Sequence, residues 1–297
     1  MGGCILNSEK LTARQMLVWI ASAMSAPLAI YGGKVSWGWT TITGALCIIL
    51  ALAALRFGSN DFGLVIRLIQ LAVLSIVAGA FAREITPCWG EGSGSMPLVL
   101  LALAALSAVN STKQAGQVCC CISWLIAIGY ALMLAVGFKN VQWERLTAVR
   151  NDGELLIVVY LMPAIWLLIP AQRANGLPLL AMVLFGLAVS ILCFGTLSAE
   201  GVTDSAVPFY QYSKSLTMMG IAERFEAIAS VALTLGLFCS LSLLLNAAER
   251  MLKHGALIGS IIAALNVPIS GKNITILAVF AWIILPLFCR IKKVKKR

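Results

Sequence analysis

The sequence predicts an all-α polytopic membrane protein with about ten transmembrane helices. Hydrophobic residues make up 60% of the chain and charged residues 11%, with a mean hydropathy of +0.94. A soluble domain carries roughly 25% charged residues. Apolar runs of spanning length recur from end to end, and the alternating segments of a β-barrel are absent. Because lipid offers the backbone no hydrogen-bond partners, these runs are expected to be helices.

Ten apolar segments follow one another along the chain. They cover residues 15–31, 35–55, 64–82, 96–110, 118–138, 154–170, 176–196, 224–247, 255–269 and 273–289. Ten spans in 297 residues leave about thirty residues for each span with its loop, so no separate soluble domain fits. We therefore expect a single transmembrane domain over residues 1–297.

The first segment is expected to be a membrane span interrupted at Pro27. It follows a polar start and shows no obvious cleavage site, so we do not expect it to be a cleaved signal. Pro27 cannot donate to the helix ladder, and a break there would free carbonyls for a cation or an amine. Ser22 and Ser25 lie three residues apart and make candidate ligand-binding hydroxyls, together with Pro27. The alternative is a proline kink whose free backbone groups are satisfied by neighbouring helices.

The sixth segment opens with a second candidate site, Gly153 and Glu154, within NDGELLIVVYLMPA. If the helix is unwound at Gly153, the first N–H groups after it would favour a ligand carboxylate. Glu154 would then meet a ligand ammonium or carry a proton. The alternative is structural: Asn151 or Asp152 caps the helix, and Glu154 favours its N-terminal dipole.

Three charges stand where the eighth segment begins: Glu223, Arg224 and Glu226. The two acids share a helix face, so we consider a charge cluster turned into the bundle that gates access to the site. The alternative is a solvated ion pair at the membrane surface, which contributes little to stability.

The ten segments divide into two similar halves. Repeat 1 covers about residues 12–138 and repeat 2 about residues 151–290, followed by a basic tail at 290–297. In each half the fourth segment is the shortest and the first carries a helix breaker. Five spans per half place the halves in opposite orientations, and an inverted repeat with interrupted helices 1 and 6 is typical of transporters.

The distribution of charge predicts that both termini are cytoplasmic. On the side of the termini lie 14 of the 22 Lys and Arg residues but only three of the 12 acids. This asymmetry follows the positive-inside rule, although most of it comes from the tail. The net charge of +10 indicates membrane topology and attraction of the tail to anionic lipid, and nucleic-acid binding is not expected.

No motif indicates an enzyme, a metal site or a cofactor. The nine cysteines form no CxxC pair, and the single histidine, His254, has no ligand partner at metal spacing. HExxH and GxSxG are absent.

Four stretches together resemble the permease (B) subunit of bacterial spore germinant receptors, of the amino acid–polyamine–organocation superfamily. They are KLTARQMLVWIASAMSAPLAI, GKVSWGWTTITGALCII, NDGELLIVVYLMPAIWLLIPAQRA and VPFYQYSKSLTMMGIAERFEA, in the family's order. The resemblance marks Gly153 and Glu154 as the unwound part of helix 6. The chain departs from the family in its length and in VQWERLTAVRN, which is short and charged where the first half of helix 6 should lie.

The resemblance implies a permease-like protein that binds a small amino-acid-type ligand at mid-membrane, for transport or for spore-germinant sensing. Its partners would be germinant-receptor A and C type subunits, and its location the cell membrane or the inner spore membrane. The alternative is a non-transporting scaffold subunit that has kept the fold and lost the ligand.

Overall fold

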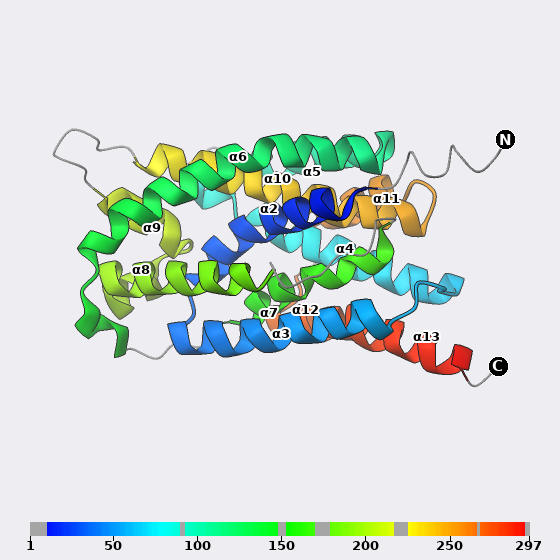
Figure 1. Cartoon of the computed structure of the whole chain (residues 1–297). Helices are drawn as coiled ribbons and strands as arrows, with labels where there is room; N and C mark the ends of the chain where they lie inside the picture. The colour runs from blue at the N-terminus through cyan, green and yellow to red at the C-terminus, as the bar shows by residue number, and fades with distance from the viewer. Residues whose placement is uncertain are drawn as a thin grey trace.

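The computed structural model describes residues 11–89, 93–147, 153–169, 179–216, 225–265 and 268–294. These residues form helices and contain no strand (Figure 1). The α-helices are α2 Ala13–Gly32, α3 Trp37–Phe57, α4 Leu64–Arg83, α5 Met96–Asn110, α6 Thr112–Gly137, α7 Glu154–Leu161, α8 Leu180–Asp204, α9 Pro208–Ser215, α10 Phe225–Met251, α11 Gly255–Ala264, α12 Gly271–Val279 and α13 Leu285–Val294. A π-helical turn, Phe280–Ile284, joins α12 to α13.

Seven helices in the described part of the chain are long and apolar enough to cross a membrane. They are Ala13–Gly32, Trp37–Phe57, Leu64–Cys88, Thr112–Asn140, Leu180–Leu197, Phe225–Met251 and Gly271–Val294. Three shorter apolar helices cover Met96–Asn110, Glu154–Leu168 and Gly255–Ala264. The predicted all-α, multi-pass membrane protein is therefore confirmed, while ten full spans in an inverted repeat stay a prediction.

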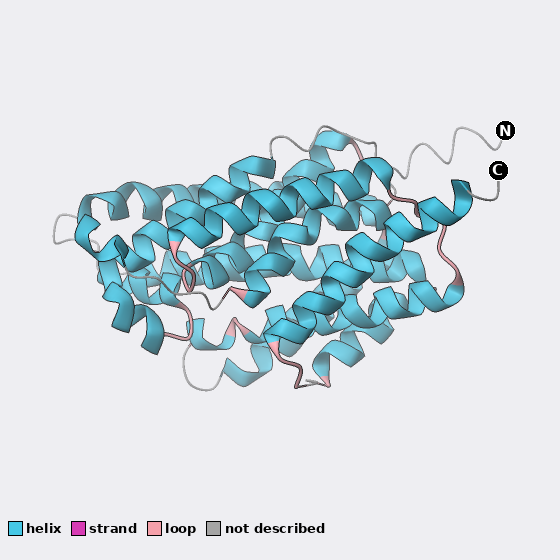
Figure 2. Ribbon diagram, turned by 90° about the horizontal axis from the view of Figure 1, so that it is seen from below, coloured by secondary structure: helices cyan, strands magenta, loops and turns pink. Residues whose placement is uncertain are grey.

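Helix α10 is the centre of the bundle. It packs against α2, α4, α5, α6 and α11, and Figure 2 shows that the bundle consists of closely packed helices joined by short loops. Leu233, Leu237, Leu241 and Leu244 are fully buried, and so is Asn246. A helix that is apolar on every side is stable only when neighbours cover it all round, so α10 fixes the positions of the helices about it.

Of all its neighbours, α10 makes the most extensive contact with α2. An added Cβ at Gly236 of α10 would lie 2.6 Å from Cβ of Ala26, so only glycine permits this approach. The indole Nε1 of Trp19 donates to the carbonyl of Cys239 at 3.2 Å. The two helices are thus held by close backbone packing and by polar contacts between them.

The predicted interruption of the first helix at Pro27 is wrong. Helix α2 continues from Ala13 to Gly32 with Pro27 inside it. Pro27 has no N–H for the carbonyl of Ala23, four residues earlier. The hydroxyl of Ser240 on α10 donates to that carbonyl instead. The neighbouring helix therefore satisfies the group that the proline leaves free, and no break is needed.

The sixth segment is irregular, as predicted. A 3₁₀ turn at Trp143–Thr147 precedes it, α7 begins at Glu154, and the chain changes to 3₁₀ helix over Met162–Leu168, where Pro163 lies. The ring of Tyr160 fits between α3 and α8, because an added Cβ at Gly44 or Gly186 would collide with it.

The first turn of α2 and the last turn of α13 lie towards the same end of the bundle (Figure 1). At this end Lys293 of α13 forms an ion pair with Asp61 in the loop between α3 and α4. The hydrogen bond from Lys293 lowers the pKa of the Asp61 carboxyl. The N–H of Ser59 also donates to the carbonyl of Pro286 at 3.2 Å, so the end of the chain is tied to this loop.

We expect Ser240→Ala to lower the free energy of unfolding by about 1–3 kcal/mol, because it leaves the buried carbonyl of Ala23 without a donor. In a Pro27→Ala background the restored N–H of residue 27 can reach that carbonyl. Ser240→Ala should then cost much less, and thermal unfolding in detergent measures both costs. Equal costs in the two backgrounds would show that the serine does not compensate for the proline. Ser260→Ala is the control, because within the described part of the chain this hydroxyl bonds only to the carbonyl of Leu257 in its own helix.

Candidate ligand-binding cavity

A cavity of about 320 Å³ lies where α2 and α4 end and where α7 and α12 begin. We call it the charged cavity. Its lining residues are Tyr31, Lys34, Glu84, Glu154, Leu155, Val202, Thr203, Ser205 and Gly271. One ammonium and two carboxylates thus face a single space of a size that fits a small ligand.

Lys34 and Glu84 form an ion pair on one wall of the charged cavity. The Nζ of Lys34 lies 3.8 Å from Oε2 of Glu84, and the hydroxyl of Tyr31 donates to Oε1 of the same carboxylate at 3.3 Å. The Lys34 ammonium also lies 5.6 Å from the centre of the Tyr31 ring. About a quarter of each charged side chain is exposed, so water screens the pair and leaves both groups accessible to a ligand.

Glu154 also lines the charged cavity, at the first position of α7. Gly153 before it has φ −92° and ψ 17°, outside the helical region, as the sequence predicted. The hydroxyl of Thr275 on α12 donates to the carbonyl of Glu154. An added Cβ at Gly271 would lie 3.1 Å from Oε2 of Glu154. The starts of α7 and α12 are thus held together with Glu154 between them.

The first residues of two helices, α7 and α12, therefore line the charged cavity. The first N–H groups of a helix lack intrahelical partners and present partial positive charge, which favours an anionic group. In α12 the hydroxyl of Ser270 accepts from one of them, the N–H of Asn273, at 3.4 Å, whereas α7 has no side-chain cap. Glu154 is exposed to the same space and favours a cation. The cavity can hold a molecule that carries both a carboxylate and an ammonium.

The structure separates the other predicted site residues from Glu154. Ser22, Ser25 and Pro27 are buried on α2 and do not line the charged cavity. The hydroxyl of Ser22 donates to the carbonyl of Val18 at 2.9 Å, and that of Ser25 to the carbonyl of Ser22 at 2.7 Å. Their ligand-binding role stays a prediction.

The predicted charge cluster is only partly within the described residues. Glu226 is half-buried in the first turn of α10. Glu223 and Arg224 lie outside the described residues, so the gating cluster stays a prediction.

Sequence reasoning missed Tyr31, Lys34 and Glu84 as members of the site. The available signal was their position: Tyr31 and Lys34 close the first apolar run, and Glu84 closes the third. Both runs are predicted to end on the same side of the membrane, where an isolated charge next to hydrocarbon is costly and a partner is expected.

Comparison with known protein families gives one match, which covers two thirds of the chain. Residues 62–259 match the model of the spore permease family, which is described as "Spore germination protein". The match covers 198 of the 297 residues and takes in α4, α5, α6, α7, α8, α9 and α10. No curated protein sequence matches the chain significantly. The chain therefore belongs to the spore permease family of spore germination proteins.

Proposed function

We propose that this permease-like membrane protein binds a small amino-acid-type ligand in the charged cavity, for transport or for germinant sensing. The observation that carries the proposal is the meeting of Lys34, Glu84 and Glu154 in one space beside two helix N-termini. An α-amino acid carries the complementary pair of charges. No step of bond making is needed, and the proposed role is binding rather than catalysis.

Each end of such a ligand has a matching group. The carboxylate would approach Lys34 and the uncapped N–H groups at the start of α7. The ammonium would approach Glu154, for which no ion pair is found among the described residues. Because Lys34 already lies near Glu84, a ligand carboxylate would compete with an existing, partly screened pair.

The topology, location and partners of the protein are part of the same proposal. It includes a 5+5 inverted repeat as in the amino acid–polyamine–organocation superfamily, cytoplasmic termini, a cell membrane or inner spore membrane location, and assembly with germinant-receptor A and C type subunits. Family membership supports the link to spore germination.

A scaffold without a ligand is the alternative function. The unbroken α2 favours it, because the serine hydroxyls near Pro27 are already used within the helix. The short 3₁₀ turn Trp143–Thr147, where the first half of helix 6 is expected, favours it too. A scaffold would keep the bundle and lose any response to amino acids.

We expect at least one of the twenty amino acids to raise the unfolding temperature of the purified protein. A ligand at a hundred times its dissociation constant adds about 2.7 kcal/mol to the free energy of unfolding. Glu154→Gln and Lys34→Gln should each remove most of this gain, because each leaves one end of the ligand unpaired. Lys139→Gln is the control, since Lys139 is an exposed lysine outside the cavity. If none of the twenty amino acids raises the unfolding temperature, the result favours the scaffold function.

We also expect both termini to be cytoplasmic. In a cysteine-free background, a cysteine placed at Ser93 should react with an impermeant reagent added outside, and one placed at Lys295 only after permeabilisation. The reverse pattern at either site would overturn the orientation given by the positive-inside rule.

A further inference from the structure

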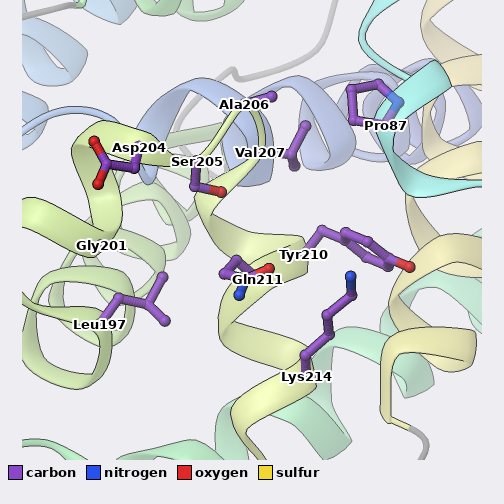
Figure 3. Close-up of a pocket in the computed structure, with 10 residues that line it drawn as sticks. All are labelled: Pro87, Leu197, Gly201, Asp204, Ser205, Ala206, Val207, Tyr210, Gln211 and Lys214. Carbon is purple, nitrogen blue, oxygen red and sulfur yellow. The ribbon is translucent and has the colours of Figure 1, made fainter. Parts of the chain in front are cut away.

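A second cavity, of about 550 Å³, opens beside the short helix α9. We call it the α9 cavity. Figure 3 shows its lining residues: Pro87, Leu197, Gly201, Asp204, Ser205, Ala206, Val207, Tyr210, Gln211 and Lys214. They come from the 3₁₀ turn Thr86–Cys88 after α4, from the end of α8 with the loop that follows it, and from α9. Only Ser205 also lines the charged cavity, so the last residues of α8 form a wall between the two.

Buried aromatic residues fix the orientation of α9. Phe209 and Tyr212 are fully buried, and the hydroxyl of Tyr212 donates to the carbonyl of Met133 on α6 at 2.8 Å. An added Cβ at Gly137 would lie 1.5 Å from this hydroxyl, so glycine makes room for it. The ring of Phe209 also lies 5.6 Å, between centres, from that of Tyr130. One face of α9 is thus pinned to the bundle.

The opposite face of α9 supplies the polar wall of the cavity. Tyr210, Gln211 and Lys214 occupy positions i, i+1 and i+4, which lie on one side of a helix. Gln211 and Lys214 are exposed, so this face is open to solvent and to a ligand.

The wall that contains Pro87 is also held in place. The hydroxyl of Ser230 on α10 donates to the carbonyl of Cys88 at 2.9 Å. The indole Nε1 of Trp89 donates to Oγ1 of Thr234, also on α10, at 2.9 Å. Two sides of the cavity are therefore fixed before any ligand arrives, which lowers the entropic cost of binding.

The polar groups of the α9 cavity suit a carboxylate. The ammonium of Lys214 lies 4.7 Å from the centre of the Tyr210 ring, and Figure 3 shows its side chain directed towards Tyr210. Gln211 lies between Lys214 and the hydroxyl of Ser205 in this view, whereas the carboxylate of Asp204 is turned away from Lys214. Among the described residues Lys214 forms no ion pair. Leu197, Val207 and Pro87 add apolar surface.

We propose that the α9 cavity is a second binding site for a small carboxylate with an apolar side chain, of the amino-acid class. Lys214 pairs with the carboxylate, Gln211 and Ser205 donate hydrogen bonds, and the apolar wall receives the side chain. The choice of an amino acid rests on the proposed function, whereas the recognition of a carboxylate rests on Lys214. Because the two cavities share Ser205, a ligand held here lies next to the charged cavity.

The test measures binding of tritiated L-alanine, L-valine and L-leucine to the purified full chain by equilibrium dialysis. The wild-type protein should bind two molecules per chain of at least one of them. Lys214→Gln should weaken one of these sites at least about tenfold, because a hydrogen-bonded charge pair is lost. Lys214→Arg should keep that site, and so should the control Lys139→Gln. Isobutylamine, which is valine without its carboxylate, should not compete at it.

The variant Glu154→Gln separates this inference from the proposed function. If it abolishes all binding while Lys214→Gln changes nothing, the charged cavity binds alone and the second site is overturned. If Lys214→Gln abolishes all binding and Glu154→Gln leaves it intact, the α9 cavity stands and the charged cavity is the wrong site. Absence of binding of all three amino acids overturns both.

Discussion

Helix α10 and helix α2 meet so closely that a side chain of each donates a hydrogen bond to a backbone carbonyl of the other, and the position of the charged cavity depends on this contact. Ser240 satisfies the carbonyl that Pro27 leaves free, and Gly236 lets the two helices approach. In the bilayer core no water is available to hydrogen-bond an unsatisfied carbonyl. The hydrogen bond from Ser240 therefore allows α2 to remain one continuous helix. The end of α2 then delivers Tyr31 and Lys34 to the charged cavity. The first half of α10 anchors the turn that carries Pro87 to the α9 cavity.

The two cavities place charged side chains in similar positions but differ in the charges that they present. Each places charged side chains at the ends of apolar helices, where water can still reach them and the cost of exposing a charge to lipid is avoided. The charged cavity holds both signs of charge and two helix N-termini, and it suits both ends of an amino acid. The α9 cavity offers an ammonium to a carboxylate and a larger apolar wall to a side chain. The end of α8 separates the two cavities. The position of its last turn therefore affects the shape of both.

Much of the fold follows from the sequence because apolar runs of spanning length leave few alternatives to a helix. The run 96–110 coincides with α5, and the run 64–82 differs from α4 by one residue. Pro27 was misread because its effect depends on Ser240, more than two hundred residues away, which no local pattern reveals. Glu154 was found because a charge after a glycine is a local signal. Lys34 and Glu84 were missed because they come together only through the packing of α2 against its neighbours.

The most direct test of the central role of the contact between α2 and α10 is the effect of Gly236→Ala, measured beside Gly38→Ala. Gly236 lies in the interior of α10, where alanine brings a gain in helix propensity of about 0.5–1 kcal/mol, and Gly38 lies in the first turn of α3, where this gain is smaller. An added Cβ meets Ala26 at position 236 and nothing within 4 Å at position 38. Gly236→Ala should lower the unfolding temperature and weaken amino-acid binding, because overpacking costs about 1–3 kcal/mol and shifts α2. Gly38→Ala should do neither. A Gly236→Ala protein that unfolds and binds like the wild type would contradict the central role of this contact.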